Sequence, residues 1–165
     1  MRIPFKMLTL LLVCFLSCGF THKAKNDEYS SKHHISAQNH AEKNQHSLVR
    51  RAHRGVGTPY VFGGESLAGF DCSGLVYWAY LSNGVKVPRM TSQQARAGYA
   101  VSKSEAAPGD IVVFRVGGSG TGLHTGIYAG GDNFIHSPKP GKTVKMDQLQ
   151  KKYWKEKLIG VRRVS

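Results

Sequence analysis

The sequence has 165 residues, of which 41% are hydrophobic and 10% aromatic, enough for one ordinary domain with a buried core and some additional chain at one end. This composition excludes a chain that is unfolded throughout. Because 23 Lys and Arg stand against 10 Asp and Glu, the net charge is +13, which favours anionic partners such as nucleic acid, acidic lipid head groups or the phosphates and carboxylates of a cell envelope.

The N-terminal segment has the features of a secretory signal peptide. Residues 1–6 contain two basic side chains, and residues 7–16 are almost entirely apolar. This apolar run is much shorter than the roughly 20 residues that a permanent transmembrane helix needs. A buried N-terminal helix is the other interpretation, but the pattern favours export and removal of the segment. Export excludes nucleic acid as the partner of the basic chain.

The end of this segment, Phe15-Leu16-Ser17-Cys18, resembles the lipobox of bacterial lipoproteins. In those proteins the cysteine is acylated and becomes the first residue of the mature chain. The resemblance implies that residues 1–18 are a lipoprotein-type signal peptide and that Cys18 is lipidated. Cleavage after Gly19 is the alternative, because small residues stand at both positions that ordinary cleavage requires. With lipidation, the protein would contact a membrane only through the lipid anchor at Cys18.

Residues 19–46 are rich in Lys, His, Asn, Ser, Gln and Glu and contain few large apolar side chains. Such a segment cannot bury enough surface to offset the entropy lost on ordering, so we expect a flexible polar tether. Five of the eight histidines lie within it, and these could scavenge metal ions. A solvated linker fits better, because the histidine spacing suits no fixed coordination geometry.

The folded domain is expected over residues 47–165, with helices in its first half and strands in its second. Helical patterns end at stop signals such as Gly55, and after Asp110 the pattern changes to β-branched residues with period two. Helices first and an antiparallel sheet second predict an α+β domain. The expected helices cover residues 47–54, 71–81 and 92–99, and the expected strands cover residues 111–116, 124–129, 133–136 and 158–164.

The helix at residues 71–81 should be the central buried helix, because apolar residues cover most of its sides. Asp71 is a favourable N-cap, and Asn83 followed by Gly84 supplies a stop signal. The helix therefore places Cys72 in its first turn.

Cys72 is the single cysteine of the expected folded domain, since Cys14 and Cys18 lie in the signal segment. In an exported protein such a cysteine is either a buried hydrophobe or a thiol kept for chemistry. Unpaired backbone N–H groups and the positive end of the helix dipole favour a thiolate in the first turn. The adjacent Asp71 charge opposes this effect. A histidine partner would settle the balance by forming an ion pair with the sulfur.

Two histidines of the second half are expected on one face of a hairpin. We expect residues 130–132 to form a three-residue loop, so that Ala129 pairs with Asn133. Counting back along both strands then places His124 as the diagonal neighbour of His136. A two-residue loop would put the two histidines on opposite faces of the sheet.

This register predicts a Cys-His-His set. Gly126 would face His136, and its missing side chain would leave that imidazole free to lean toward His124. His124 is then the base for Cys72, and His136 orients His124. The alternatives are half-buried structural histidines and a zinc site made by the same three residues, although no further cysteine completes a zinc pattern. We expect no metal and no cofactor, and His53 is expected to be a surface or packing residue.

Six motifs occur in an order that resembles the NlpC/P60 family of cell-wall cysteine peptidases, from about Ser47 to Ser165. The resemblance implies a papain-like fold with permuted chain order, and it implies the same nucleophile, base and polar third residue as above. The motifs are Pro59-Tyr-Val-Phe-Gly-Gly64, Phe70-Asp-Cys-Ser-Gly74, Pro88-Arg89 followed by Gln93-Gln94, Pro108-Gly-Asp110, His124-Thr-Gly-Ile-Tyr128 and Phe134-Ile-His136.

The resemblance also implies roles near the nucleophile for three further residues. Tyr60 would help to bind the oxyanion, because a phenol can donate a hydrogen bond to developing negative charge. Asp71 and Ser73 would line the substrate cleft, where the carboxylate could attract a substrate ammonium. Thr125 and Phe62 depart from the residues most common in the family, which bears on substrate preference rather than on activity.

A lipobox, a short tether and a single domain most resemble the murein DD-endopeptidase lipoproteins of Gram-negative bacteria, which cut the cross-links between stem peptides of peptidoglycan. Gly19 after the acylated cysteine would direct such a lipoprotein to the outer membrane, facing the periplasm. We therefore expect a monomeric, exported peptidoglycan endopeptidase. The alternatives are an endopeptidase that cuts between D-glutamate and the diamino acid within one stem peptide, a wall-binding module without turnover, and an acyltransferase.

Overall fold

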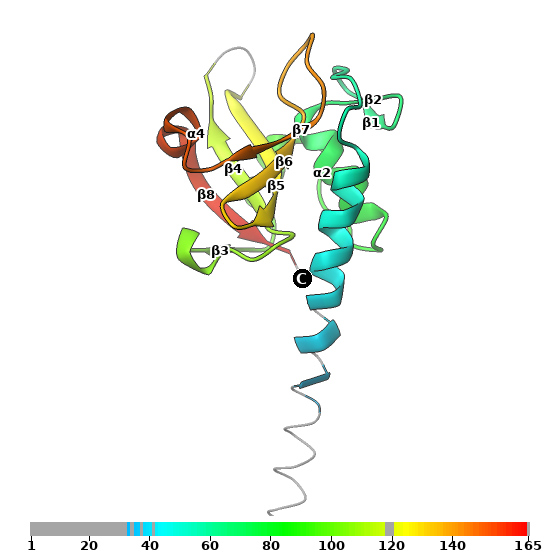
Figure 1. Ribbon diagram of the computed structural model, residues 1–165, viewed down its shortest axis with the longest axis vertical. Coiled ribbons are helices and arrows are strands. Elements are labelled where there is room, and N and C mark those ends of the chain that lie inside the picture. The colour runs from blue at the N-terminus through cyan, green and yellow to red at the C-terminus, as the bar shows by residue number, and fades with distance from the viewer. Residues whose placement is uncertain (1–32, 34, 37, 41, 118–120, 165) are drawn as a thin grey trace, which may run out of the picture. The chain divides into compact units, whose positions relative to one another are not determined.

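The computed structural model describes residues 33, 35–36, 38–40, 42–117 and 121–164 (Figure 1). The expected signal peptide lies outside these residues, as do the expected lipidation site Cys18 and most of the expected tether. Contacts divide the chain into two units, residues 1–40 and residues 41–165. In the first unit every described residue is helical. No helix of the described residues is long and apolar enough to cross a membrane.

The first helix of the second unit covers residues 42–54, so it begins before Ser47, where the folded domain was expected to start. Glu42 and Lys43 are good helix formers, and they lie in the first turn of this helix. The later residues of the helix pack into the core of the domain. Leu48 and Ala52 are buried in the core. The guanidinium of Arg51 lies 3.9 Å from the centre of the Trp78 ring. This cation–π contact joins the helix at residues 42–54 to the helix that contains Trp78.

Helix α2 (Cys72–Leu81) is the central helix, as predicted. Asp71 is its N-cap, because the side chain accepts a hydrogen bond of 2.6 Å from the backbone N–H of Gly74. The helix buries Leu75, Val76, Ala79 and Tyr80. Cys72 is its first residue, so the predicted position of the thiol at the helix start is confirmed.

A six-stranded antiparallel sheet forms the second layer and confirms the α+β class. Its strand order is β3-β8-β4-β5-β6-β7. All four predicted strands are present within a residue or so of their expected ends. The strands are β3 (Tyr99–Val101), β4 (Ile111–Arg115), β5 (Leu123–Gly130), β6 (Asn133–His136), β7 (Lys145–Gln148) and β8 (Leu158–Arg163).

The hairpin between β5 and β6 has the predicted register but a different loop. Tyr128 pairs with Phe134, as expected, whereas Gly130 rather than Ala129 pairs with Asn133. The loop therefore has two residues, and a β-bulge at Ala129 restores the register. Gly131 and Asp132 have φ values of 56° and 63°, as a type I′ turn requires. The bulge explains why the two histidines still share a face of the sheet.

The smaller elements differ more from expectation. The helix expected over residues 92–99 is reduced to α3 (Thr91–Gln94), because Gly98 adopts a positive φ and the following residues form β3. Helix α4 and strands β3 and β7 were not expected from the sequence. The remaining elements are the hairpin of β1 (Glu65–Ser66) and β2 (Gly69–Phe70), the 3-10 turn η1 (Lys103–Glu105) and α4 (Lys152–Lys157).

Each face of the sheet carries its own hydrophobic cluster. On one face, Ile111, Val113 and Ile127 pack with α2 and the helix at residues 42–54. On the other face, Phe114 and Phe134 pack with Trp154 of α4. Because side chains alternate along a strand, β5 presents neighbouring residues to two different environments.

Candidate active site

Cys72 lies against the open edge of β5. Strand β6 pairs with β5 only from Ile127 onward, so the first residues of β5 have no β6 partner. The backbone N–H of Thr125 interacts with the Cys72 sulfur and lowers the pKa of the thiol. The fold therefore brings the thiol to the residue next to His124.

The surroundings of Cys72 favour the thiol over the thiolate. Burial raises the pKa of Cys72, the backbone N–H of Thr125 lowers it, and the charge of Asp71 raises it further. The N–H groups of Cys72 and Ser73 at the helix start lower the pKa of the thiol as predicted, but its net pKa in the free protein lies above the ordinary value. The reason is that the sulfur is removed from water beside a carboxylate, which outweighs the helix N–H groups.

His124 and His136 form the buried pair that the register predicts. The Nε2 atom of His124 lies 2.8 Å from Nδ1 of His136, and the two rings meet edge to face. The exposed fraction is 4% for His124 and zero for His136. A Cβ added to Gly126 would lie 3.2 Å from the Cβ of His136, so the glycine makes the predicted room for this imidazole.

Burial keeps both imidazoles neutral. It lowers the pKa of His124 to about 4, and burial together with the neighbouring His124 lowers the pKa of His136 to about 3. One of two neutral rings must then donate in their hydrogen bond. If Nε2–H of His124 donates, Nδ1 of His124 is left with a free lone pair and can accept a proton from a thiol.

Asp147 of β7 extends the pair to a third group. Its Oδ2 atom lies 3.7 Å from Nε2 of His136, which has no hydrogen-bond partner among the described residues. Burial raises the pKa of Asp147, but hydrogen bonds from Lys151 and Lys145 outweigh burial and hold this pKa well below its usual range. A carboxylate facing Nε2 favours the tautomer of His136 that carries its proton there. Nδ1 of His136 is then the acceptor that His124 needs.

Tyr60 lies close enough to Cys72 to interact with it electrostatically. Burial raises the pKa of its phenol, and the charges of Cys72 and Asp71 raise it further. The phenol therefore stays protonated and can donate a hydrogen bond. The backbone of Tyr60 is fixed by a 2.8 Å hydrogen bond from its N–H to the carbonyl of Lys142.

The carboxylate of Asp71 is fully engaged within the protein. Its Oδ1 atom accepts from the N–H of Gly74 and from the hydroxyl of Ser73, and its Oδ2 atom accepts from the N–H of Gly63 at 3.0 Å. Two guanidinium nitrogens of Arg89 also donate to it, at 3.0 and 2.9 Å. Asp71 therefore caps α2 and holds the start of this helix against Gly63 and Arg89. Its attraction for a substrate ammonium stays a prediction.

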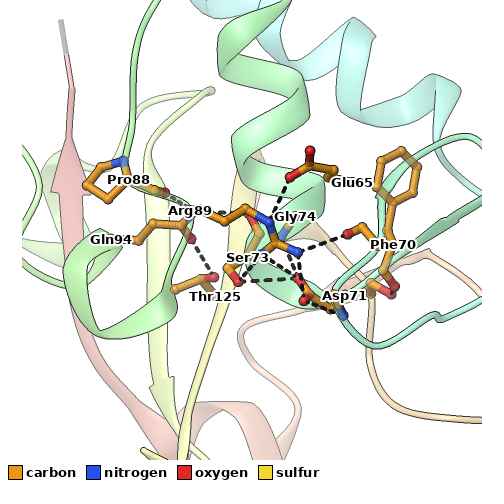
Figure 2. A network of polar contacts seen from close by, with 12 residues as sticks. Glu65, Phe70, Asp71, Ser73, Gly74, Pro88, Arg89, Gln94 and Thr125 are labelled. Carbon is orange, nitrogen blue, oxygen red and sulfur yellow. Dashed lines mark hydrogen bonds and ion pairs between the residues drawn. The ribbon is translucent and has the colours of Figure 1, made fainter.

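Arg89 is the centre of this network, as Figure 2 shows. Besides Asp71, its guanidinium donates to the Glu65 carboxylate at 2.9 Å, to the Ser73 hydroxyl at 2.9 Å and to the carbonyl of Gly64. One side chain thus ties the β1–β2 hairpin to the first turn of α2. Ser73 is held by Arg89 and Asp71, and its expected place in the cleft likewise stays a prediction.

Gln94 joins helix α2 to strand β5 (Figure 2). Its side-chain nitrogen donates to the carbonyls of Ser73 and Pro88, and its side-chain oxygen accepts from the Thr125 hydroxyl at 2.9 Å. The side chain is completely buried. Because Ser73 and Thr125 follow Cys72 and His124 directly, this amide helps to fix the spacing between Cys72 and His124.

Three positioning residues of this site had no role assigned from the sequence. Arg89 and Gln94 stand in recognisable motifs, which was the signal available for them. Asp147 stands between lysines on a strand without β-branched residues, so nothing in the sequence indicates that it is buried. In the described part of the chain, no group of three His, Cys, Asp or Glu side chains is arranged to hold a metal ion.

The sequence profile that defines the NlpC/P60 family matches residues 57–163. Among curated proteins, the chain is 33% identical over 164 residues to Murein DD-endopeptidase MepH of Escherichia coli, covering 90% of this chain and 60% of that protein. It is 39% identical over 109 residues to a Gamma-D-glutamyl-L-lysine dipeptidyl-peptidase of Bacillus subtilis, covering 66% of this chain and 37% of that protein.

Among solved structures, a lipoprotein-like NLP/P60 family protein of Staphylococcus aureus superposes with a TM-score of 0.68 at 36% identity. The superposition covers 74% of this chain and 42% of that one. The chain thus spans only part of the length of these relatives, about three fifths of the E. coli protein and less of the others. The shared region contains Cys72, both histidines and Asp147.

Proposed function

Because the chain belongs to the NlpC/P60 family, we propose that it is a cysteine hydrolase that cleaves peptide bonds in the stem peptides of peptidoglycan. The observation that carries this proposal is the buried 2.8 Å hydrogen bond between His124 and His136. His124 lies in β5, directly before the Thr125 N–H that interacts with the Cys72 sulfur. A neutral imidazole oriented by a second group beside a thiol is the arrangement that acyl transfer through cysteine needs.

The first step is attack of the Cys72 sulfur on the carbonyl carbon of the substrate. Because the free protein holds a neutral thiol and a neutral imidazole, Nδ1 of His124 removes the thiol proton as the sulfur attacks. The imidazolium that forms shares its Nε2–H with His136. The Tyr60 phenol donates a hydrogen bond to the oxygen on which negative charge develops.

The second step breaks the peptide bond. His124 gives its proton to the leaving nitrogen, the amine departs, and the acyl group remains on Cys72 as a thioester. A water molecule then attacks the thioester carbon while His124 takes one of its protons. Return of this proton to the sulfur releases the carboxylic acid and restores the starting thiol and imidazole. No cofactor takes part in these steps.

We place the cleaved bond in the cross-link between two stem peptides. The similarity to Murein DD-endopeptidase MepH, which covers most of this chain, supports this choice. The second candidate is cleavage between D-glutamate and the diamino acid, which the similarity to the Gamma-D-glutamyl-L-lysine dipeptidyl-peptidase favours. Both reactions use the same nucleophile and base and differ only in how the peptide lies.

Digestion of purified, cross-linked peptidoglycan separates these candidates. The products are identified by mass spectrometry, with Cys72→Ala as the inactive control. Loss of dimeric muropeptides with a matching gain of intact monomers supports cross-link cleavage, whereas shortened monomers support the second candidate. Binding of peptidoglycan without release of any peptide would instead make the protein a wall-binding module.

The site of action proposed with this activity is the periplasm, with the chain exported through residues 1–18 and anchored to the outer membrane by a lipid on Cys18. The lipobox-like sequence before Cys18 supports this proposal. Labelling of cells with radioactive palmitate tests it. Label in the wild type and none in Cys18→Ala is the expected result, and an unlabelled, soluble wild type would favour cleavage after Gly19. The chain is proposed to act as a monomer, which analytical ultracentrifugation tests.

A further inference from the structure

A cleft of about 560 Å³ opens beside His124 on the α4 side of the sheet. Its apolar wall includes Tyr153 and Trp154, and Trp154 stacks on the His124 ring at 5.6 Å between ring centres. Cys72 is not among the residues that line it. The cleft therefore borders His124 without reaching Cys72.

The rim of this cleft is strongly cationic. Four lysines line it, and Asp147 is the single acidic residue in its lining, which leaves a net charge of +3 while His124 is neutral. The lysines are Lys139, Lys142, Lys145 and Lys151.

These lysines fall into two pairs with different surroundings. Lys145 and Lys151 bind Asp147, with nitrogen to oxygen distances of 2.9 and 2.5 Å. Lys139 and Lys142 have no acidic partner among the described residues, and both are exposed. The second pair is therefore available to an anion from solution.

The chemistry of the proposed reaction says which part of the substrate reaches this cleft. His124 must protonate the leaving nitrogen, so the amine side of the scissile bond lies next to the His124 ring. The chain that continues from that nitrogen extends away from Cys72. His124 borders the lysine-lined cleft, which therefore offers space for this part of the substrate.

We propose that this lysine-lined cleft binds the leaving-group side of the substrate through a free carboxylate on it, and that Lys139 and Lys142 provide the selectivity for that charge. The proposal rests on the proposed function. A diamino acid whose leaving amine stands on a carbon that also bears a free carboxyl group presents that carboxylate next to the nitrogen, and two ammonium groups complement it. The apolar wall at Tyr153 and Trp154 covers the hydrocarbon part of the same residue.

The Lys142 backbone places this cleft correctly for the reaction. Its carbonyl accepts the hydrogen bond from the N–H of Tyr60, the residue that donates to the oxyanion. Thr143 pairs with Pro59, and the N–H of Val144 donates to the carbonyl of Thr58. Because these bonds fix the segment to the Tyr60 loop, a carboxylate bound there has a defined distance from the scissile bond.

The test uses two synthetic cross-linked peptides that differ only in the carboxyl group next to the leaving nitrogen, free in one and amidated in the other. The double variant Lys139→Gln/Lys142→Gln is compared with Lys86→Gln/Lys155→Gln, which removes the same charge at exposed positions outside the cleft. Wild type and control should prefer the free acid by about fivefold to tenfold in kcat/KM, as two exposed ion pairs allow.

The cleft variant should lose this preference by cleaving the acid more slowly and the amide unchanged, and added salt should weaken the preference of the wild type. Equal preference in the cleft and control variants would overturn the proposal, as would a wild type that cleaves acid and amide equally well. A wild type that cleaves neither peptide nor peptidoglycan would refute the proposed function itself, so the two failures are distinguishable.

Discussion

Asp147 provides the sharpest perturbation of the proposed mechanism, because Asp147→Asn removes one charge and leaves the shape of the side chain almost unchanged. The carboxylate of Asp147 lies 3.7 Å from Nε2 of His136 and takes no part in the bond-making and bond-breaking steps proposed above. We expect it to act as a positioning residue. Its loss should lower kcat, because His136 no longer favours the tautomer that leaves Nδ1 of His124 free to accept the thiol proton.

The expected size of this effect follows from the distances. Two unit charges 3.7 Å apart interact by about 4 kcal/mol at an effective dielectric constant of about 20. This value is an upper limit for Asp147, because the positive charge of the proposed mechanism develops on His124, one ring further from the carboxylate than His136. Lys145 and Lys151 offset much of the carboxylate charge, since both lie closer to it than His136 does. We therefore expect a loss of about 1–2 kcal/mol in transition-state stabilisation, which lowers kcat about fivefold to thirtyfold.

The assay measures kcat and KM on a cross-linked peptide together with the imidazole nitrogen chemical shifts by NMR. The control is Asp132→Asn, which also removes a carboxylate paired with a lysine, but in the β5–β6 turn. Asp147→Asn should lower kcat and change the tautomer of His136. An unchanged kcat, or a lower kcat with both histidine tautomers as in the wild type, would refute the positioning role.

Three further predictions concern the same residues. Gly126→Ala should abolish most of the activity, because the added Cβ would lie 3.2 Å from the Cβ of His136 and 2.9 Å from a backbone oxygen. The control is Gly160→Ala, whose added Cβ meets no atom within 4 Å, and equal activity of the two variants would contradict the expectation. Arg89→Gln should lower the free energy of unfolding by about 2–3 kcal/mol, because Asp71 and Glu65 lose their ion-pair partner. Calorimetry should show a Tm lowered by about 5–10 °C. A shift no larger than that of the exposed control Arg96→Gln would show that Arg89 does not stabilise the start of α2. His124 and His136 have pKa values of about 4 and about 3 when folded and about 6.5 when unfolded, so the unfolded chain binds more protons below pH 6.5. Each histidine should therefore lower the free energy of unfolding by about 2 kcal/mol between pH 7 and pH 5. Urea titrations at the two pH values measure this change, and equal stability would show that the histidines are not buried as neutral rings.

The central helix and the paired histidines are predictable from the sequence because their signals are local. Asp71 before an apolar run marks the helix start, and β-branched alternation marks β4 and β5. The hairpin shows how a wrong local detail can leave the result intact. The loop has two residues rather than three, but the bulge at Ala129 compensates, so His124 and His136 meet as predicted.

The remaining features depend on tertiary contacts that leave little trace in the sequence. Strand β7 consists of mostly exposed polar residues, and only its pairing with β6 reveals that Asp147 is buried. The pKa of Cys72 is a similar case. A helix start predicts a lowered pKa, yet burial against β5 raises it, and burial is known only once the sheet is in place.

The measurement that tests the central claim most directly is the capture of an acyl-enzyme on Cys72. A cross-linked peptide is mixed with the protein, the reaction is quenched in acid within one turnover, and peptide mapping by mass spectrometry locates the added mass. We expect the acyl group on Cys72 in the wild type, none in Cys72→Ala, and product release that depends on His124. An acyl group on another residue, or full activity of Cys72→Ala on purified peptidoglycan, would contradict the account.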